Sequence, residues 1–262
     1  MSLEEFYRYF RWWMEPSDPR AVERFRSIVR FFESLELSVE SVLDVGAGTG
    51  IAGVAAAKAF SASRVTLVDK REEDMMKATE WMAVGGVSPS IMMVTGDVLD
   101  LPHLVGRHEV ALLWGHSMPH FDPFEAVRLF SGVAAVLKED GVFFIEETDR
   151  IKRFFYESSP KSFFVEKGKE ERLVSLHEGY SVRRGMERRG YYRLPGFEKV
   201  VDMELRPWDL ASQLALGRIF FRRAELITPE EHGLAGVSNV IILRGPKGNI
   251  AREVYSEFQN FV

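Results

Sequence analysis

One short segment restricts the fold of this chain more than any other: an apolar run followed by clustered glycines and an alanine-rich stretch. Residues 42–45 are apolar apart from Asp44, and Gly46, Gly48 and Gly50 follow directly. Glycine reaches backbone conformations that other residues avoid, so this cluster predicts a tight turn. The alanine-rich residues after the turn favour a helix. The segment therefore predicts a strand, a tight turn and a helix in succession.

Apolar runs and amphipathic stretches continue to alternate along the first half of the chain. This alternation is typical of an α/β fold, in which helices cover both faces of a mostly parallel sheet. Asp122 and Pro123 suit the N-cap and first position of a helix, and Lys138 suits its last turn. We expect helices near 49–60, 71–84 and 122–138, and strands near 41–45, 64–69, 91–95, 108–114 and 141–147.

The glycine turn suits two classes of ligand. Residues 48–53 satisfy the G-x-G-x-x-G pattern of dinucleotide sites, where a pyrophosphate lies at the helix N-terminus. Asp44 would repel a pyrophosphate but attract S-adenosylmethionine, which carries an ammonium and a sulfonium. At ~4 Å this attraction is worth roughly 1 to 4 kcal/mol, enough to bias the choice. Asp44 therefore favours the sulfonium compound, and an ordinary tight turn without a ligand stays open as the alternative.

Residues 42–50 resemble motif I of the class I S-adenosylmethionine-dependent methyltransferases, whose pattern is apolar-apolar-Asp/Glu-x-Gly-x-Gly-x-Gly. The resemblance implies a Rossmann-like, seven-stranded, mostly parallel sheet with helices on both faces and an antiparallel pair of strands at its end. It also implies S-adenosyl-L-methionine as the cofactor. The methionyl part would then lie against Asp44 and the turn residues Gly46, Ala47, Gly48, Thr49 and Gly50.

Two later acidic residues agree with this family in order and spacing. Asp69 ends an apolar run 19 residues after the last glycine of the turn, close to the spacing of about 20 for an acid that binds ribose hydroxyls. In the family, an acid after the third strand contacts the adenine amino group and the next residue packs on the ring, which implies these roles for Asp97 and Val98. Lys70 joins the expected cofactor site. A nicotinamide dinucleotide site also has an acid after the second strand, so Asp69 does not distinguish it from an S-adenosylmethionine site. Asp44 and Asp97 are the residues that discriminate between the two cofactors.

Composition limits the functional classes. With 262 residues, 46% of them hydrophobic and 28% charged, the chain is expected to form one large globular domain with an inserted subdomain. It has no apolar run near the ~20 residues that span a bilayer and no signal-peptide pattern, so we expect a cytoplasmic location. The absence of cysteine excludes disulfides and thiolate sites. The six histidines lack metal-ligand spacing, so no metal is expected, and the net charge of −5 does not suggest nucleic-acid binding.

The first residues contain a dense aromatic cluster. Phe6, Tyr9, Phe10 and Trp13 are spaced three and four residues apart, so they would form one stripe on a helix. Most such stripes belong to a core. In the resembling family an N-terminal helix closes over the cofactor, and aromatic faces attract a sulfonium as they attract an ammonium. Tyr9 and Trp13 are therefore candidate cofactor contacts, and a second helix is expected near 18–36.

The segment after the fifth expected strand is basic. Residues 150–193 contain 12 Lys and Arg against 6 Asp and Glu, which predicts either a solvated face or a cationic lid that attracts an anionic substrate group. Residues 173–180 and 186–192 are typical of a β-hairpin, with a third strand over 197–206. A helix over 180–193 is the main rival, because arginine is a good helix former.

The core is expected to resume after this insert. We expect a short helix over 209–216, strands over 218–227 and 237–244, and a final helix or tail over 250–262. The resulting organisation has four parts: an N-terminal helical cap (1–38), a cofactor-binding core (39–150), an inserted, partly β lid for the substrate (151–206), and the end of the core sheet with the C-terminal segment (207–262).

Residues 114–121 follow the fourth expected strand, at the edge where open α/β sheets bind ligands. They lack the Asn/Asp-Pro-Pro-Tyr/Phe motif of nucleobase amino methylation. They are similar instead to the Gly-Asn-Ser-x-x-His segment of small-molecule N-methyltransferases resembling glycine N-methyltransferase, with His116 in place of Asn. A histidine can accept the proton that a nucleophile sheds or orient the acceptor by a hydrogen bond. His116 and His120 are the candidate catalytic residues, and structural hydrogen bonds are the alternative.

The remaining candidates complete the expected site. Trp114 is assigned to the cofactor, and the substrate is assigned Ser117, Tyr156 and Arg150, which can grip a carboxylate with two hydrogen bonds. The sequence thus predicts an S-adenosylmethionine-dependent methyltransferase acting on a small molecule. The cationic lid, as the functional interpretation of the basic segment, would suit an anionic group on that molecule. The alternatives are an RNA or protein methyltransferase that uses the basic insert, a cofactor-sensing module without turnover, and an NAD(P)-dependent oxidoreductase. The sequence predicts neither the acceptor atom nor the oligomeric state.

Overall fold

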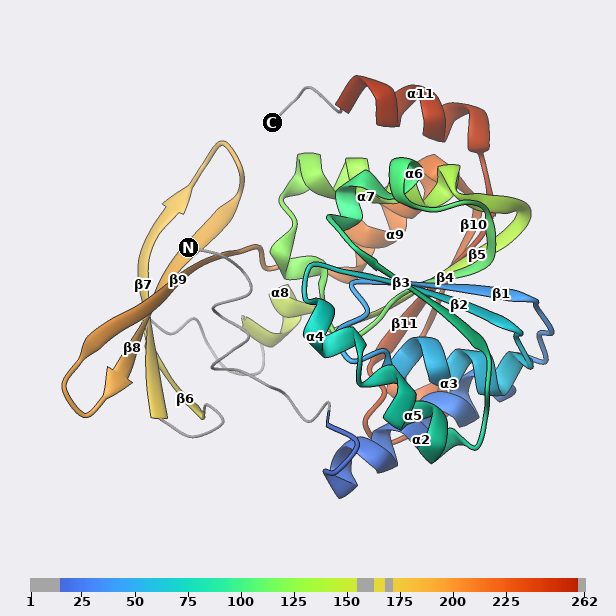
Figure 1. Ribbon diagram of the computed structural model, residues 1–262. Helices are drawn as coiled ribbons and strands as arrows, with labels where there is room; N and C mark the ends of the chain where they lie inside the picture. Colours follow the sequence, from blue (N-terminus) through green and yellow to red (C-terminus); the bar gives the residue numbers. More distant parts are fainter. Residues whose placement is uncertain (1–14, 155–162, 168–171, 259–262) are drawn as a thin grey trace. The chain divides into compact units, whose positions relative to one another are not determined.

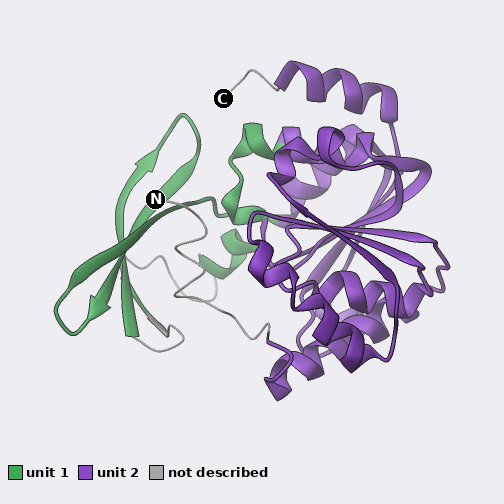
Figure 2. Cartoon of the chain, in the orientation of Figure 1, with its two compact units in different colours: residues 1–12, 118–126, 149–209 green, residues 13–117, 127–148, 210–262 purple. Residues whose placement is uncertain are grey.

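The computed structural model describes residues 15–154, 163–167 and 172–258. The chain divides into two compact units (Figure 2). Unit 1 contains 118–126 and 149–209, and unit 2 contains 13–117, 127–148 and 210–262, apart from the residues outside the described ranges. Each unit contains one β-sheet. Within the described ranges, the helices all lack the length or the apolar character needed to cross a membrane.

Unit 2 is built on a seven-stranded sheet with the strand order β10-β11-β5-β4-β1-β2-β3. Strands β1 to β5 are parallel, and β11 is antiparallel to both of its neighbours. The predicted seven-stranded, mostly parallel sheet with a final antiparallel pair is confirmed. The strands are β1 Ser41–Val45, β2 Arg64–Asp69, β3 Ser90–Thr95, β4 His108–Leu113, β5 Leu137–Glu147, β10 Phe221–Ile227 and β11 Asn239–Pro246.

Helices cover both faces of this sheet (Figure 1). Helices α2, α3 and α5 lie on one face, and α6, α7, α9 and α11 lie on the other. The helices are α2 Pro19–Glu33, α3 Ile51–Phe60, α4 Glu72–Met75, α5 Ala78–Gly85, the 3-10 turn η1 Val98–Asp100, α6 Leu101–Leu104, α7 Pro123–Ala135, α9 Leu210–Phe220, α10 Pro229–His232 and α11 Gly248–Phe258.

An aromatic cluster beneath α2 forms much of the core of unit 2. Asp18 caps this helix by accepting a hydrogen bond from the N–H of Arg20. The buried Phe32 ring of α2 lies 5.1 Å from the ring of Phe60 in α3 and 5.4 Å from that of Phe144 in β5. Burial of one phenylalanine side chain stabilises a fold by about 1.5–3 kcal/mol. This cluster therefore fastens α2 and α3 to the middle of the sheet.

The helix expected over 71–84 is interrupted. The N–H of Lys77 donates to the carbonyl of Asp74, three residues back rather than four, so the turn tightens between α4 and α5. The next boundary also differs, because α7 ends at Ala135 and β5 begins at Leu137, which pairs with His108 of β4. The strand therefore begins four residues before its expected start.

The sixth expected strand begins three residues later than predicted. Residues 218–220 belong to α9, which runs to Phe220. Leu216, Gly217 and Phe220 are buried at helical spacing, and a Cβ on Gly217 would lie 2.5 Å from a side-chain methyl carbon of Leu243 in β11. Close packing of α9 on β11 thus extends the helix into a stretch whose sequence favours a strand.

Unit 1 contains a four-stranded antiparallel sheet with the order β6-β7-β8-β9. The predicted hairpin and its third strand are confirmed. The rival helix over 180–193 is wrong, because Tyr180 pairs with Glu187 across the hairpin. The sequence did not predict β6. The elements are β6 Phe163–Lys167, β7 Arg172–Ser181, β8 Met186–Leu194, β9 Glu198–Leu205, the 3-10 turn η2 Met118–His120 and α8 Arg150–Lys152.

Candidate active site

The carboxyl ends of β1, β2, β3 and β4 lie along one edge of the unit 2 sheet, because these strands are parallel neighbours. The chain adds β2 and β3 on one side of β1, then crosses to add β4 and β5 on the other. Open α/β sheets bind ligands in the crevice at such a change of direction. The residues predicted to bind a cofactor after the first three strands all belong to this edge.

The glycine turn between β1 and α3 is attached to the end of β2. The N–H groups of Gly46 and Ala47 donate to the carbonyl of Val68 at 2.8 and 3.1 Å. Gly46 and Gly50 have φ angles of +70° and +75°, which glycine adopts without strain. A Cβ on Gly50 would also lie 2.9 Å from the Cβ of Ala78. The turn therefore requires glycine for both its backbone conformation and its close approach to α5.

Asp44 is buried beneath this turn, with 1% of its surface exposed. Its Oδ2 atom accepts a hydrogen bond of 2.7 Å from the N–H of Gly53, in the first turn of α3. Burial raises the pKa of the Asp44 carboxyl to about 7, although the hydrogen bond from Gly53 opposes the shift; the charge of Asp69 adds to it. A neighbouring cation would favour the ionised form. This environment fits the predicted ammonium ligand, and direct contact with it stays a prediction.

Asp69 is the last residue of β2, and Asp97 lies two residues beyond β3. Asp69 accepts hydrogen bonds from the N–H of Gly48 at 2.8 Å and from the Arg71 guanidinium at 3.1 and 3.2 Å. Asp97 forms an ion pair of 2.7 Å with Lys70. The structure thus brings the three predicted acids to one sheet edge and turns Lys70 toward the third of them. Their contacts with a cofactor stay predictions.

Arg71 is a feature of this edge that the sequence analysis missed. Its backbone N–H also donates to Asp69, at 2.9 Å, and its guanidinium contacts Asp74 at 2.8 Å. A carboxylate offers about four lone-pair sites, and the bonds from Gly48 and Arg71 occupy all of them on Asp69. Ribose hydroxyls could therefore bind Asp69 only by displacing the guanidinium. A basic residue two positions after the acid was the available signal.

The other predicted turn and strand residues have contacts within the protein. Thr49 accepts a hydrogen bond of 3.1 Å from the indole N–H of Trp81, and Val98 begins η1. The Trp114 ring lies 4.9 Å from Phe32 and 5.9 Å from Phe31. The Trp114 indole therefore belongs to the core beneath α2, and its predicted cofactor contact gains no support from this position.

His116 lies in the loop after β4. Its φ angle of +64° places it in the left-handed region that favours glycine. Its Nε2 atom lies 2.8 Å from the hydroxyl of Ser238 and 3.5 Å from that of Thr148. Ser117 follows it and is half-buried. No sequence signal pointed to Ser238, which is 122 positions away from His116.

Two further candidates belong to unit 1. His120 ends η2, and Arg150 begins α8 and donates its backbone N–H to the carbonyl of Trp208 at 3.0 Å. Their catalytic and substrate-binding roles stay predictions. Tyr9, Trp13 and Tyr156 lie outside the described residues. In the described part of the chain, no three His, Asp or Glu side chains gather as a metal site would require, and the metal-free site stays a prediction.

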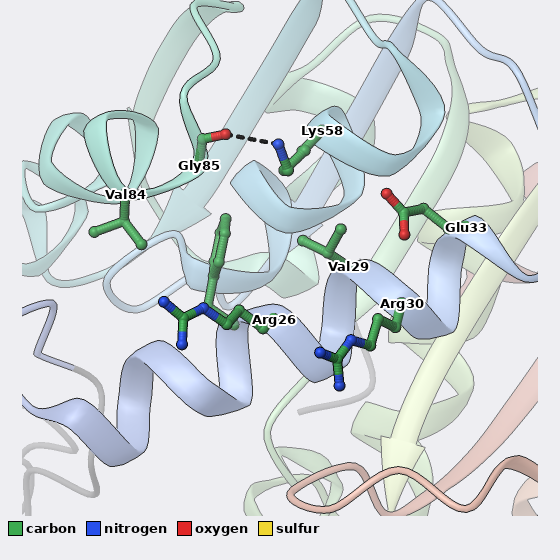
Figure 3. A pocket seen from close by; sticks show the side chains of 8 residues that line it. Arg26, Val29, Arg30, Glu33, Lys58, Val84 and Gly85 are labelled. Carbon is green, nitrogen blue, oxygen red and sulfur yellow. Dashed lines mark hydrogen bonds between the residues drawn. The ribbon is translucent and has the colours of Figure 1, made fainter.

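A separate hollow lies among α2, α3 and α5 (Figure 3). Its lining includes Arg26, Arg30 and Lys58, and Lys58 donates to the carbonyl of Gly85 at 2.8 Å, at the end of α5. Lys58 is seven residues beyond the start of α3, which corresponds to roughly 10 Å along a helix. The hollow is thus remote from the glycine turn, and its lysine is engaged in closing a helix C-terminus.

Part of the sequence and the fold of this chain are similar to those of known proteins. Residues 42–141 match the family model described as a methyltransferase domain. The solved structure of the PH0226 protein from Pyrococcus horikoshii is 17% identical, covers 94% of this chain and 100% of that chain, and has a TM-score of 0.65. An S-adenosylmethionine-dependent methyltransferase from Clostridium acetobutylicum is 14% identical, with coverages of 85% and 90% and a TM-score of 0.60.

A third similar structure is a sugar N-methyltransferase from a Streptoalloteichus species. It is 15% identical, with coverages of 94% of this chain and 93% of that chain and a TM-score of 0.55. At these identities the structural likeness shows a shared fold. No curated protein matches the chain.

Proposed function

We propose that this chain, which belongs to the class I S-adenosylmethionine-dependent methyltransferases, transfers methyl groups to a small-molecule acceptor. The observation that carries the cofactor half of the proposal is the row of acids at the ends of three adjacent parallel strands, next to a glycine turn. Among the described residues, the buried Asp44 carboxyl has a raised pKa and accepts its hydrogen bond from a backbone N–H rather than from a cation, so it favours a cation in a ligand. When bound, S-adenosylmethionine supplies an electron-poor methyl group on its sulfonium.

The residues of this edge then each contact a different part of the cofactor. Asp44 and the backbone of the glycine turn hold the methionyl part, Asp69 holds the ribose, and Asp97 with Val98 holds the adenine. The acceptor lies beyond the end of β4, where His116 orients it or accepts its proton. Because methyl transfer is an in-line displacement at an activated carbon, alignment by these residues contributes more than general base catalysis.

Three observations favour a small acceptor over RNA or protein. The segment after β4 lacks the motif of nucleobase amino methylation, and a structurally similar enzyme is a sugar N-methyltransferase. The basic insert is also partly neutralised within unit 1. Arg184 pairs with Asp122 at 2.6 Å, and Arg189 pairs with Glu187 at 2.6 Å. These two arginines are therefore engaged within unit 1, and binding of an anionic acceptor group by Arg150 stays a prediction from the sequence.

Methyl transfer from S-adenosylmethionine labelled in its methyl group tests this function. The purified protein is incubated with amino sugars, small amines and small carboxylates in separate reactions, and with total RNA and a protein mixture in others. We expect labelled small-molecule product together with S-adenosylhomocysteine, and loss of most product in the His116→Ala variant. Label confined to RNA or protein, or no label with any acceptor class, would contradict the proposal.

A further inference from the structure

A buried carboxylate connects the segments around His116. Glu146 lies near the end of β5, and its side chain is fully buried. It accepts hydrogen bonds from the N–H of Gly115 at 3.0 Å, the N–H of Ser238 at 3.0 Å and the Arg24 guanidinium at 2.7 Å. These donors belong to the loop after β4, the segment before β11, and α2. One carboxylate therefore joins three segments that are far apart in sequence.

Two of these donors adjoin the imidazole of His116. Gly115 precedes it in the chain, and the hydroxyl of Ser238 lies 2.8 Å from its Nε2 atom. The N–H of His116 also donates to the backbone carbonyl of Glu146 at 3.3 Å. The ring and the backbone of His116 are thus both held by Glu146 or by a residue that Glu146 holds.

The loop adopts a backbone conformation that needs this support. Gly115 has a φ of +91°, and His116 has a φ of +64°. A residue with a Cβ is unfavourable in the left-handed region, so it stays there when the surroundings impose the conformation, often at functional sites. The hydrogen bonds from Gly115, His116 and Ser238 to Glu146 supply that constraint.

We propose that Glu146 and Ser238 are positioning residues that fix the backbone and the imidazole of His116 at the end of β4. This inference rests on the proposed function, which places His116 at the acceptor. A buried ion pair with Arg24 would by itself be weak support for stability. The carboxylate of Glu146 instead accepts hydrogen bonds from the N–H of Gly115, the residue before the histidine, and from the N–H of Ser238, whose hydroxyl contacts the imidazole, and this arrangement is expected of a support for the ring.

The ¹⁵N spectrum of the imidazoles tests the arrangement without any acceptor. The chain has six histidines, and His116→Gln identifies the His116 signal by its loss. Ser238→Ala removes the hydroxyl and keeps the backbone N–H, so we expect the His116 tautomer signal to move, and Ser238→Thr to restore it. Ser131→Ala is the matched control, because this buried serine donates to the carbonyl of Arg128 in α7.

Glu146→Gln tests the carboxylate. A glutamine offers one acceptor oxygen instead of two, so it cannot accept hydrogen bonds from both backbone N–H groups at their present positions. We expect the His116 signal to move and kcat to fall by about tenfold or more, as misalignment predicts. KM for S-adenosylmethionine should stay within about twofold of the wild-type value, because changes at sites that share no contacts have independent effects. The matched control is Glu109→Gln at the other end of β4, whose carboxylate contacts the N–H groups of Glu40 and Ser41 and the ammonium of Lys138.

The outcomes separate this inference from the proposed function. A His116 signal that moves in Ser238→Ala, returns in Ser238→Thr and is unchanged in both controls supports the positioning role. A signal that is unchanged in Ser238→Ala and Glu146→Gln overturns it, whether or not the protein methylates any acceptor. Absence of methyl transfer to every acceptor in the wild-type protein counts against the proposed function, and the spectral test still decides the positioning role.

Discussion

At the scale of single residues, two carboxylates of the cofactor edge have opposite surroundings. Asp44 is buried and accepts a hydrogen bond of 2.7 Å from the backbone N–H of Gly53, whereas Asp69 accepts hydrogen bonds from Gly48 and from three nitrogen atoms of Arg71. The sequence indicated both acids through their positions near the ends of apolar runs. The basic residue two positions after Asp69 was a signal for Arg71 as its partner, but spacing alone does not determine that the guanidinium folds back onto the carboxylate.

Asp44 should make stability depend on pH. Its pKa of about 7 in the folded protein exceeds the unfolded value of 3.8, so the folded state binds more protons between these values. The free energy of unfolding therefore falls as pH rises from about 4 to about 7. Asp44→Asn removes this contribution, so the variant should gain stability relative to wild type with increasing pH. Urea unfolding of both proteins across this range measures the difference, and a difference independent of pH would contradict the assignment.

Arg71 should oppose cofactor binding if Asp69 holds the ribose. Arg71→Met removes the guanidinium that the ribose hydroxyls would displace, and we expect S-adenosylhomocysteine to bind about tenfold more tightly, as loss of a charge-assisted hydrogen bond implies. Arg244→Met is a matched control, because its guanidinium pairs with Glu225 at 3.8 Å, between β11 and β10 at the opposite edge of the sheet from β3. Titration calorimetry gives both affinities. Unchanged or weaker binding by Arg71→Met would argue against the ribose role of Asp69.

At the scale of elements, the first turn of α3 is packed against the end of β1. A Cβ on Gly53 would lie 2.9 Å from Oδ2 of Asp44 and 3.0 Å from a methyl carbon of Leu67.

Periodicity and turn residues predicted most of the helices and strands of unit 2. They misplaced the start of β10, because burial of Leu216 and Phe220 in α9 outweighs the strand preference of the residues that follow.

Gly53→Ala should destabilise the protein although alanine is the better helix former. Relief of the contact with Asp44 requires movement, and overpacking of this kind costs about 1–3 kcal/mol, more than the ~1 kcal/mol that alanine gains over glycine in a helix. Gly106→Ala, where an added Cβ meets open space, should change stability by less than about 0.5 kcal/mol. Chemical denaturation compares the two, and a Gly53→Ala variant as stable as wild type would refute the close packing.

At the scale of the whole molecule, the alternation of strands and helices was enough to predict a mostly parallel sheet with helices on both faces, whereas the seven strands and the final antiparallel pair were expected from the family resemblance. The acids of the cofactor edge were predictable because each lies at or just beyond the carboxyl end of a strand. The support around His116 was not predictable from the sequence. Glu146, Ser238 and Arg24 meet through tertiary contacts between residues 92 to 122 positions apart, so no local sequence pattern indicates them. Edge β6 was missed for a similar reason, since its pairing with β7 defines it as a strand.

The central claim is that the carboxyl edge of the unit 2 sheet binds S-adenosylmethionine through its acids. Titration calorimetry with S-adenosylhomocysteine and with NADH, on wild type and Asp69→Asn, tests it most directly. We predict binding of S-adenosylhomocysteine and not of NADH to wild type, with affinity weakened about tenfold in Asp69→Asn through loss of hydrogen bonds to a charged group. Binding of NADH alone, or S-adenosylhomocysteine binding that Asp69→Asn leaves unchanged, would contradict the account.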